Sequence, residues 1–248
     1  MTDRSVASAH SAEETMLRLH EFCMAHIKEA TSAAEVEIRE ILHLEADITS
    51  WLTALENQPE AQQLRSAHQD FGLAFYSAMS GLYRQSFASL RSFLEVTCGA
   101  VYLSSLEFKR RQWVSGKLDI SWTSITSIDE GIYSVAFLRE FCPEAQLERE
   151  QCVADLKRSY RRCSEYVHGN VSTSLLLPTE IAYRDEVLKE WITVAKSTLI
   201  SVIHCFTVRY YKDFRDDQRQ IVEGCLEEHF AHLESVRTLL QLPIEESK

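Results

Sequence analysis

Residues 153 to 170 read VADLKRSYRRCSEYVHGN. Apolar or semi-apolar residues recur here at alternating spacings of three and four, at Val153, Leu156, Tyr160, Cys163 and Val167. This spacing predicts one buried face of an α-helix. Gly169 follows the last periodic position, where glycine can take the left-handed conformation that closes a helix. We therefore expect a helix from about residue 146 to 168 that ends in a group of basic side chains.

Helical spacing also dominates the rest of the chain. Only 7 glycines and 4 prolines interrupt 248 residues, and the prolines separate long runs of helix formers. The predicted fold class is all-α. The expected helical runs cover residues 11–57 with a break near 31–34, a run opening at 59–60 and continuing through 71, and then 73–104, 107–114, 134–141, 146–168, 180–213 and 216–242.

Local signals mark several of these boundaries. Ser11 and Glu14 form a capping-box pattern at the start of the first run. Gly116 is expected to end the short basic helix 107–114, and Trp122 to anchor the connection that follows it. Leu175 to Leu177 are expected to pack back onto the other helices.

Charge and cysteine usage restrict the function. The formal net charge of −11 argues against a protein that coats nucleic acid with its whole surface, because phosphates would be repelled. Seven scattered cysteines without Cys-x-x-Cys pairs indicate reduced thiols in the core. Residues 1–12 carry no signal-peptide core, and no uncharged apolar run approaches about 18 residues. We expect a cytoplasmic protein without a membrane partner.

Two groups of histidines and cysteines suggest metal binding. The groups are His20-x-x-Cys23-x-x-His26 and Cys225-x-x-x-His229-x-x-His232. The second group lies on one helical face, as zinc ligands can, but a single helix rarely completes a site. The two groups together would need the first and last helices to touch. We expect satisfied surface or interface histidines and no metal. No glycine-rich phosphate loop or dinucleotide fingerprint is present, so no cofactor is expected.

Two stretches together resemble a known family. The segment YRQSFASLRSFLE (residues 83–95) resembles the early core helix of bacterial HEPN-like proteins. Arg161 or Arg162 through His168-Gly169 resembles their Arg-x(4–6)-His motif. The resemblance covers about residues 71–211. It implies a helical bundle, which would here have extra long helices at both termini. Residues 1–57 would form an N-terminal extension and residues 58–248 the bundle. Alternatively, the two parts form one continuous domain.

The resemblance also implies a function. Many HEPN proteins are homodimeric, metal-independent ribonucleases of toxin and antiviral defence systems, so RNA and an antitoxin or other defence-system protein are the expected partners. Such enzymes attack a phosphodiester with its own 2′-hydroxyl and leave a 2′,3′-cyclic phosphate. His168 can move the proton, because an unperturbed histidine titrates near neutrality. An arginine can bind the non-bridging oxygens.

Helical geometry favours one of the two candidate arginines. Arg161 and His168 are seven residues apart and lie only about 20° apart around a regular helix, whereas Arg162 and His168 lie about 120° apart. We predict the catalytic pair Arg161 and His168, with Arg162 as the other candidate. The substrate-binding residues are expected to be Arg158, Glu165, Tyr166, Asn170 and Arg91. Arg91 also has an intrahelical partner in Glu95.

Three alternatives stay open. Arg161 can pair with Glu165, four residues on, and leave His168 as an ordinary helix-end residue. The chain can be a catalytically inactive HEPN-like subunit that binds or regulates a partner protein. It can also be an unrelated helical scaffold that oligomerises through its terminal helices, in which case Arg161 and His168 should not share a solvent-facing groove.

Overall fold

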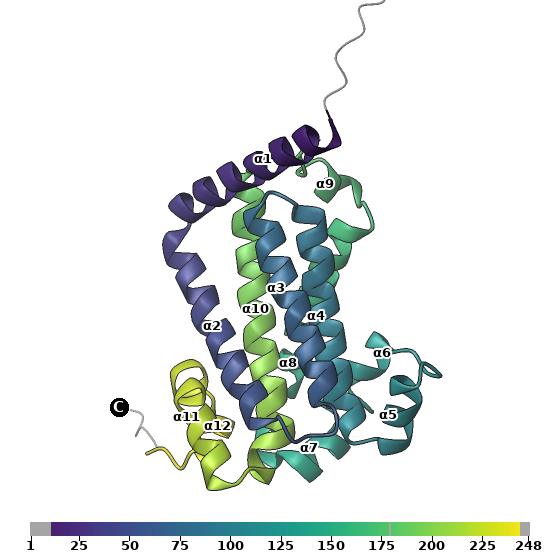
Figure 1. Ribbon diagram of the computed structural model, residues 1–248. Coiled ribbons are helices and arrows are strands. Elements are labelled where there is room, and N and C mark those ends of the chain that lie inside the picture. Colours follow the sequence, from purple (N-terminus) through teal and green to yellow (C-terminus); the bar gives the residue numbers. More distant parts are fainter. Residues whose placement is uncertain (1–10, 179, 244–248) are drawn as a thin grey trace, which may run out of the picture.

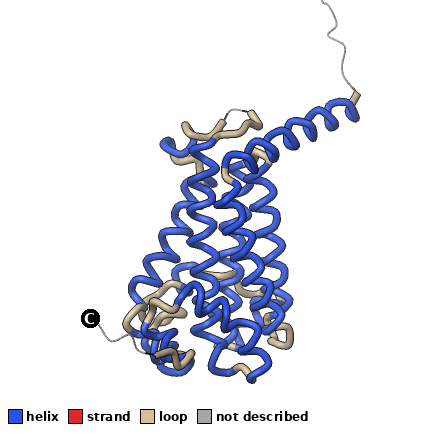
Figure 2. Tube along the Cα trace, turned by 90° about the vertical axis from the view of Figure 1, so that its left-hand side faces the viewer, coloured by secondary structure: helices blue, strands red, loops and turns tan. Residues whose placement is uncertain are grey.

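The computed structural model describes residues 11–178 and 180–243. Every regular element in these ranges is a helix, which confirms the all-α class (Figure 2). The elements are α1 (Ala12–Ala33), α2 (Glu35–Ala54), α3 (Ala61–Met79), α4 (Tyr83–Ser104), α5 (Glu107–Val114), α6 (Trp122–Ile125), α7 (Val135–Phe141), η1 (Pro143–Gln146), α8 (Arg149–Val167), α9 (Val171–Ser174), α10 (Asp185–Tyr210), η2 (Tyr211–Asp213), α11 (Asp216–Phe230) and α12 (Glu234–Leu239).

The long helix α10 lies at the centre of the bundle. It packs against α2, α3, α4 and α8, which run along it in Figure 1. The segment Asp185–Asp213 is long and apolar enough to cross a membrane, but 78% of the residues in its most apolar window are buried inside the bundle. This burial is what the core helix of a bundle requires.

One hydrophobic core runs from Ala30 on α1 to Val236 on α12 and includes α2. Of the seven cysteines, all free, only Cys152 is partly exposed, so the prediction of reduced core thiols is confirmed for the other six. The N-terminal half of α1 extends beyond the bundle, as Figure 2 shows. Residues 1–10 lie outside the described ranges, and with them most of the segment inspected for a signal peptide.

Several predicted boundaries are confirmed. The Ser11–Glu14 capping box opens α1, and the break between α1 and α2 falls at Ala34. The helix 107–114 has the expected ends. Gly116 and Gly169 both have a positive φ of 69°. Glycine tolerates this region without the steric cost of a Cβ.

Other boundaries were predicted wrongly. The break between the second and third runs falls at Gly81, because α3 continues through Gly72. Gly81 has φ 78°, and a Cβ there would lie 3.0 Å from the Ala182 carbonyl oxygen. The last run is divided between α11 and α12, where Leu233 is extended. In the loop before α10, Leu175 is 80% exposed and only Leu177 packs on the core.

The packing of α4 on α8 brings distant parts of the sequence together. The rings of Phe87 on α4 and Tyr166 on α8 stack at 3.9 Å between centroids and 3° between planes. Phe87 lies one turn from both Arg84 and Arg91 on α4. This stack therefore sets both arginines beside the C-terminal end of α8.

Candidate functional site

His168, at the end of α8, bonds to an arginine of another helix. Arg91 Nη1 on α4 lies 3.0 Å from His168 Nε2. Because a guanidinium can only donate, Nε2 must accept, which requires a neutral ring with its proton on Nδ1. The same guanidinium donates from Nη2 to the Tyr160 hydroxyl at 2.5 Å. Arg91 thus holds a histidine and a tyrosine of α8 in one planar fork.

A second arginine of α4 contacts the same helix end. Arg84 Nη1 donates to the Val167 carbonyl oxygen at 3.2 Å. Carbonyls at a helix C-terminus lack intrahelical partners and carry partial negative charge, so a cation is favourable there. A Cβ on Gly169 would lie 3.9 Å from the same Arg84 nitrogen. Arg84, Arg91 and His168 therefore gather at one helix end.

Aromatic packing fixes the tyrosine of this group. Trp122 on α6 stacks on Tyr160 with centroids 4.3 Å apart and planes 12° apart. The Arg91 guanidinium carbon lies 4.6 Å from the Tyr160 ring centroid, within cation–π range. The expected anchoring role of Trp122 is thus met by a ring stack. We call Arg84, Arg91, Tyr160 and His168 the α4/α8 cluster.

The α4/α8 cluster is accessible and has a cationic surplus. His168 and Arg84 are exposed, and the Arg91 side chain is 23% exposed. One carboxylate, Glu95, lies 3.8 Å from Arg91 Nε, as an ion pair without a hydrogen bond to that nitrogen. A hollow of about 270 Å³ lies beside Arg91, between α4, Ile120 and Val167. A small anionic group can reach the arginine from this side.

The predicted pair of Arg161 and His168 is not brought together. The Arg161 side chain is 83% exposed and its Nε donates to Glu165 Oε1 at 3.2 Å, which is the alternative pairing considered above. Arg161 and Glu165 lie with Arg162 along a groove between α8 and α10, and His168 does not line this groove. Seven-residue spacing puts Arg161 and His168 on one stripe, but Glu165 lies within reach of Arg161, whereas the His168 ring turns to α4. The cationic partner of His168 is Arg91.

Arg162, the other candidate, is held by two carboxylates. It donates to Glu190 on α10, and its Nη1 donates to Glu165 Oε2 at 2.8 Å. The hydrogen bond to Glu190 raises the pKa of Arg162, and the hydrogen bond from Arg162 lowers the pKa of Glu165. Its charge is therefore matched inside the protein. We call Arg161, Arg162, Glu165 and Glu190 the α8/α10 cluster.

The remaining predicted binding residues are dispersed. Arg158 pairs with Asp155 at 2.8 Å and faces the α8/α10 side. Tyr166 is only 1% exposed, because its ring belongs to the core, so it cannot line an open site. Asn170 is exposed just beyond His168, and its carbonyl oxygen accepts from Ser174 N and Thr173 Oγ1. Among the predicted binding residues, Arg91 bonds to His168.

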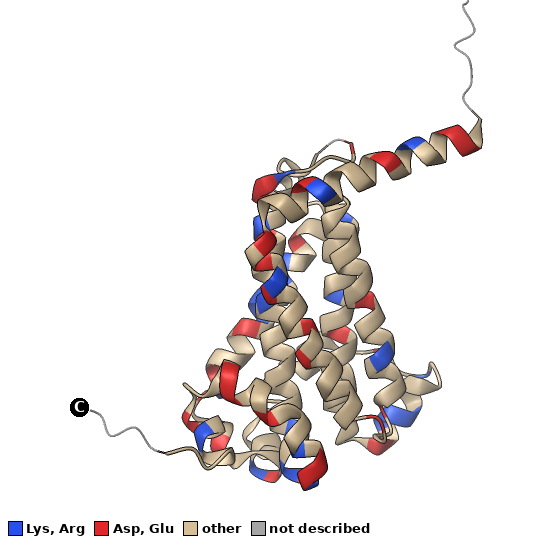
Figure 3. Cartoon of the chain, turned by 60° about the vertical axis from the view of Figure 1, so that its left-hand side comes forward, with Lys and Arg blue, Asp and Glu red and all other residues tan. Residues whose placement is uncertain are grey.

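Charges are mixed over the surface. In the view of Figure 3, Lys and Arg alternate with Asp and Glu along the helices and form no continuous basic face. This distribution accords with the net charge of −11. The α4/α8 cluster is a local group of cations within this mixed surface.

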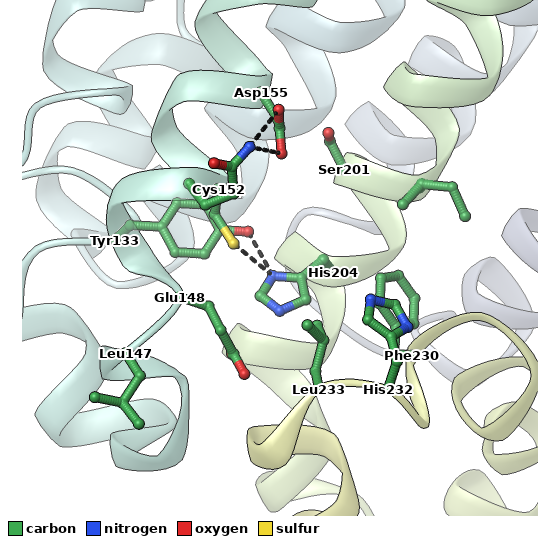
Figure 4. A pocket seen from close by; sticks show the side chains of 12 residues that line it. Tyr133, Leu147, Glu148, Cys152, Asp155, Ser201, His204, Phe230, His232 and Leu233 are labelled. Atoms are coloured by element: carbon green, nitrogen blue, oxygen red, sulfur yellow. Dashed lines mark hydrogen bonds between the residues drawn. The ribbon is translucent and has the colours of Figure 1, made fainter.

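A separate cavity of about 380 Å³ lies between α8, α10 and the turn that joins α11 to α12 (Figure 4). Inside it the Tyr133 hydroxyl lies 2.8 Å from His204 Nδ1, and Cys152 Sγ lies 3.7 Å from the same nitrogen. Burial lowers the pKa of His204 to about 4 and raises the pKa of Cys152 to about 12. A neutral histidine beside a protonated thiol makes no thiolate nucleophile at neutral pH.

The two histidine–cysteine groups lie at opposite ends of the bundle. Figure 1 places α1, which carries His20, Cys23 and His26, at the top and α11 at the bottom. His26 Nε2 lies 3.3 Å from the Ile181 carbonyl oxygen, and His232 lines the cavity of Figure 4. The two groups therefore cannot share one ion.

No family model, curated protein or solved structure matches this chain. The assignment of function therefore rests on the geometry and chemistry of the described residues.

Sequence reasoning missed two members of the α4/α8 cluster. Tyr160 falls on the apolar stripe of α8, and its hydroxyl role becomes visible only when α4 is in place. Arg84 and Arg91 are seven residues apart on one face of α4, next to a buried stripe. That spacing already indicates that both arginines need partners, because charges beside a core are seldom left unpaired, but it does not say that the end of α8 supplies them.

Proposed function

We propose that this protein is a metal-independent RNA endonuclease whose active site is the α4/α8 cluster. The contact between Arg91 and the exposed His168 is the observation that carries the proposal. It joins a phosphate-binding cation to a neutral histidine that can take a proton. The sequence resemblance to HEPN-like ribonucleases adds independent support, and under it the chain would act in a toxin or antiviral defence system.

The proposed reaction is an intramolecular transfer. His168 removes the proton of the ribose 2′-hydroxyl, whose oxygen then forms a bond to phosphorus. The bond from phosphorus to the 5′-oxygen breaks, and a proton goes to that leaving oxygen. The products are a 2′,3′-cyclic phosphate and a free 5′-hydroxyl. Arg91 and Arg84 stabilise the negative charge that accumulates on the non-bridging oxygens.

Substrate binding requires a change of partners at Arg91. A phosphate oxygen would replace His168 Nε2 as an acceptor of the guanidinium, which frees that nitrogen for the 2′-hydroxyl. The hydrogen bond from Arg91 Nη2 to the Tyr160 hydroxyl keeps the guanidinium in place. In the homodimer that the resemblance implies, His168 of a second copy would protonate the 5′-oxygen.

A metal-free cleavage assay tests this proposal. Full-length protein is incubated with end-labelled RNA and excess EDTA, and His168→Ala and Arg91→Ala are compared with Arg161→Ala as the matched control. General acid–base catalysis contributes at least about 100-fold, so His168→Ala should lose at least that much rate. Arg91→Ala should lose comparable activity, and Arg161→Ala should keep the wild-type rate.

The outcomes separate the alternatives. Equal cleavage by all four proteins, or no cyclic-phosphate product from the wild type, would overturn the proposal. Loss of activity in Arg161→Ala with normal activity in Arg91→Ala would indicate an active site formed by Arg161 and His168, without α4. Circular dichroism spectra of each variant show whether a lost activity reflects lost folding.

The second candidate function is an inactive protein-interaction subunit, which the exposed apolar residues of α1 favour. These side chains are at least 40% exposed and belong to Met16, Leu17, Leu19, Phe22 and Met24. Apolar groups gathered on a projecting helix are typical of an interaction surface. A second copy of this chain is the simplest occupant, and Leu17→Glu with Phe22→Glu should then reduce the mass measured by light scattering. An unchanged mass would remove this support.

A further inference from the structure

The interface of α2 and α11 gathers metal-ligating side chains away from the α4/α8 cluster. His43 and Asp47 lie one turn apart on α2, and Cys225 and His229 lie one turn apart on α11. Residues four apart share a helix face, and the two helices pack against each other. Each helix therefore presents two donors to the same interface. A metal ion bound there would need no ligand from α1.

The donor atoms are already close. Asp47 Oδ2 lies 2.8 Å from His229 Nε2. One ligand atom each from Asp47, Cys225 and His229 lie within 4.8 Å of one another, and the same holds for His43, Glu228 and His229. His229 belongs to both sets. Ligand atoms around tetrahedral zinc are roughly 3.5 Å apart, so small side-chain rotations are enough to enclose an ion.

The inner set is enclosed by the protein. Cys225 is 6% exposed, and the side chains of Asp47 and His229 are 15% and 14% exposed. An aspartate, a thiol and an imidazole are a typical zinc donor set. With the thiol ionised, the aspartate and thiolate neutralise the two charges of Zn²⁺. The more exposed His43 belongs with Glu228 and His229 to the outer set, its Nε2 lies 2.9 Å from Glu228 Oε2, and a turn of its ring can supply a fourth ligand.

A buried indole N–H supplies a second, independent observation. Trp51 lies one turn beyond Asp47 on α2 and is fully buried, and its Nε1 has no hydrogen-bond partner among the described residues. The Trp51 side chain interacts with the Cys225 thiol across the interface of α2 and α11. A donor aimed at sulfur is a common outer partner of a metal-bound thiolate.

We propose that Asp47, Cys225 and His229, with His43 as fourth ligand, form a structural zinc site that fastens α11 to α2. The thiol proton is released on binding, and the Trp51 N–H then donates to the zinc-bound sulfur. This site is independent of the proposed RNA cleavage, because its residues lie on other helices and the cleavage needs no metal.

Metal content of the purified full-length chain tests the site. The protein is incubated with excess ZnCl₂, desalted and analysed by inductively coupled plasma mass spectrometry. The expected result is one zinc per chain in the wild type and in two controls, Cys23→Ser and His232→Gln. The exposed fraction of Cys23, 8%, is similar to the 6% of Cys225, but Cys23 lies on α1. Cys225→Ser and His229→Gln should lose the metal while keeping a helical circular dichroism spectrum.

Cobalt substitution gives a second readout that does not depend on stability. Co²⁺ bound to the wild type should show a thiolate-to-cobalt charge-transfer band, which Cys225→Ser should lack and Cys23→Ser should retain. A wild type that retains no zinc and shows no such band would overturn the proposal. Loss of metal in Cys23→Ser, or equal retention in Cys225→Ser, would also overturn it by placing the ion elsewhere.

Discussion

The two sides of α8 hold arginines in different surroundings. In the α8/α10 cluster, Arg161 and Arg162 face two carboxylates, Glu165 and Glu190, and each arginine bonds to at least one of them. In the α4/α8 cluster, the hydrogen bonds of Arg84 and Arg91 end on a carbonyl, a hydroxyl and an imidazole. Among the described residues on that side, Glu95 forms the one ion pair with these arginines, 3.8 Å from Arg91 Nε.

The difference shows how function can be separated from structure among many charged residues. An arginine matched by carboxylates has little charge left for a ligand, and its removal is costly where the carboxylates that it leaves behind are buried. An arginine bonded to neutral acceptors keeps its positive charge for an incoming anion. By this criterion the α8/α10 cluster is structural, whereas the α4/α8 cluster is suited to phosphate. Changes to each side should therefore have different effects.

The largest stability change is expected from Arg162→Met. This variant leaves Glu165 and Glu190 half-buried without their shared cation, so the free energy of unfolding should fall by about 2 kcal/mol. Urea denaturation measures the loss. The control is Arg161→Met, whose side chain is 83% exposed and whose removal should cost less than about 0.5 kcal/mol. Equal losses would contradict a structural role specific to Arg162.

A smaller effect is expected from Arg91→Lys, measured as the rate of RNA cleavage. Lysine keeps the charge but cannot hold His168 and Tyr160 in one planar fork, so the rate should fall about tenfold, equivalent to about 1.4 kcal/mol. Arg161→Lys should cleave at the wild-type rate. If Arg91→Lys is fully active, charge alone suffices and the fork has no role.

The smallest effect is expected from Glu165→Gln, measured as unfolding free energy against pH. The hydrogen bond from Arg162 lowers the pKa of Glu165 in the folded protein, so its carboxylate stabilises the fold above the unfolded pKa of about 4.3. That contribution is lost as pH falls through the lower folded pKa. At pH 7 the variant should be less stable by under about 1 kcal/mol, and the gap should close in acid.

A surface carboxylate provides the control for this pH experiment. Glu140 pairs with Arg139, and the two side chains are 67% and 70% exposed, respectively. Glu140→Gln should follow the wild-type curve at every pH. A gap between wild type and Glu165→Gln that stays constant down to pH 3 would show that the carboxylate charge is not the cause.

Much of the fold could be predicted from the sequence because helical periodicity and caps are local properties. The Ser11 capping box and the ends of α5 depend on neighbours within four residues. The break at Gly81 is also local, because Gly81 has φ 78° and Leu82 N donates to the Ser77 carbonyl oxygen at 2.8 Å. Local pattern cannot reveal the approach of the Ala182 carbonyl oxygen, 101 positions further on, which would lie 3.0 Å from a Cβ at Gly81.

The candidate site was only partly predictable for the same reason. The sequence marks His168 through the helix end and Gly169. Angular spacing can be calculated only for residues of the same helix, and on α8 it favours Arg161 as the partner. Arg91 approaches from α4, and no rule of helix geometry gives the distance between side chains on two helices. A ligand role for His43 and Asp47 could not be predicted from their own helix, because their partners lie about 180 residues further on.

The separation of Arg91 and His168 by 77 positions has a consequence for the synthesis of the chain. A nascent chain that ends at α7 already contains both arginines of α4 but neither Tyr160 nor His168. The α4/α8 cluster can form only after the ribosome has released α8 and it has docked on α4 through Phe87 and Tyr166. A nascent chain that has not yet reached α8 therefore has no complete cluster, and translation products that stop before His168 lack it altogether.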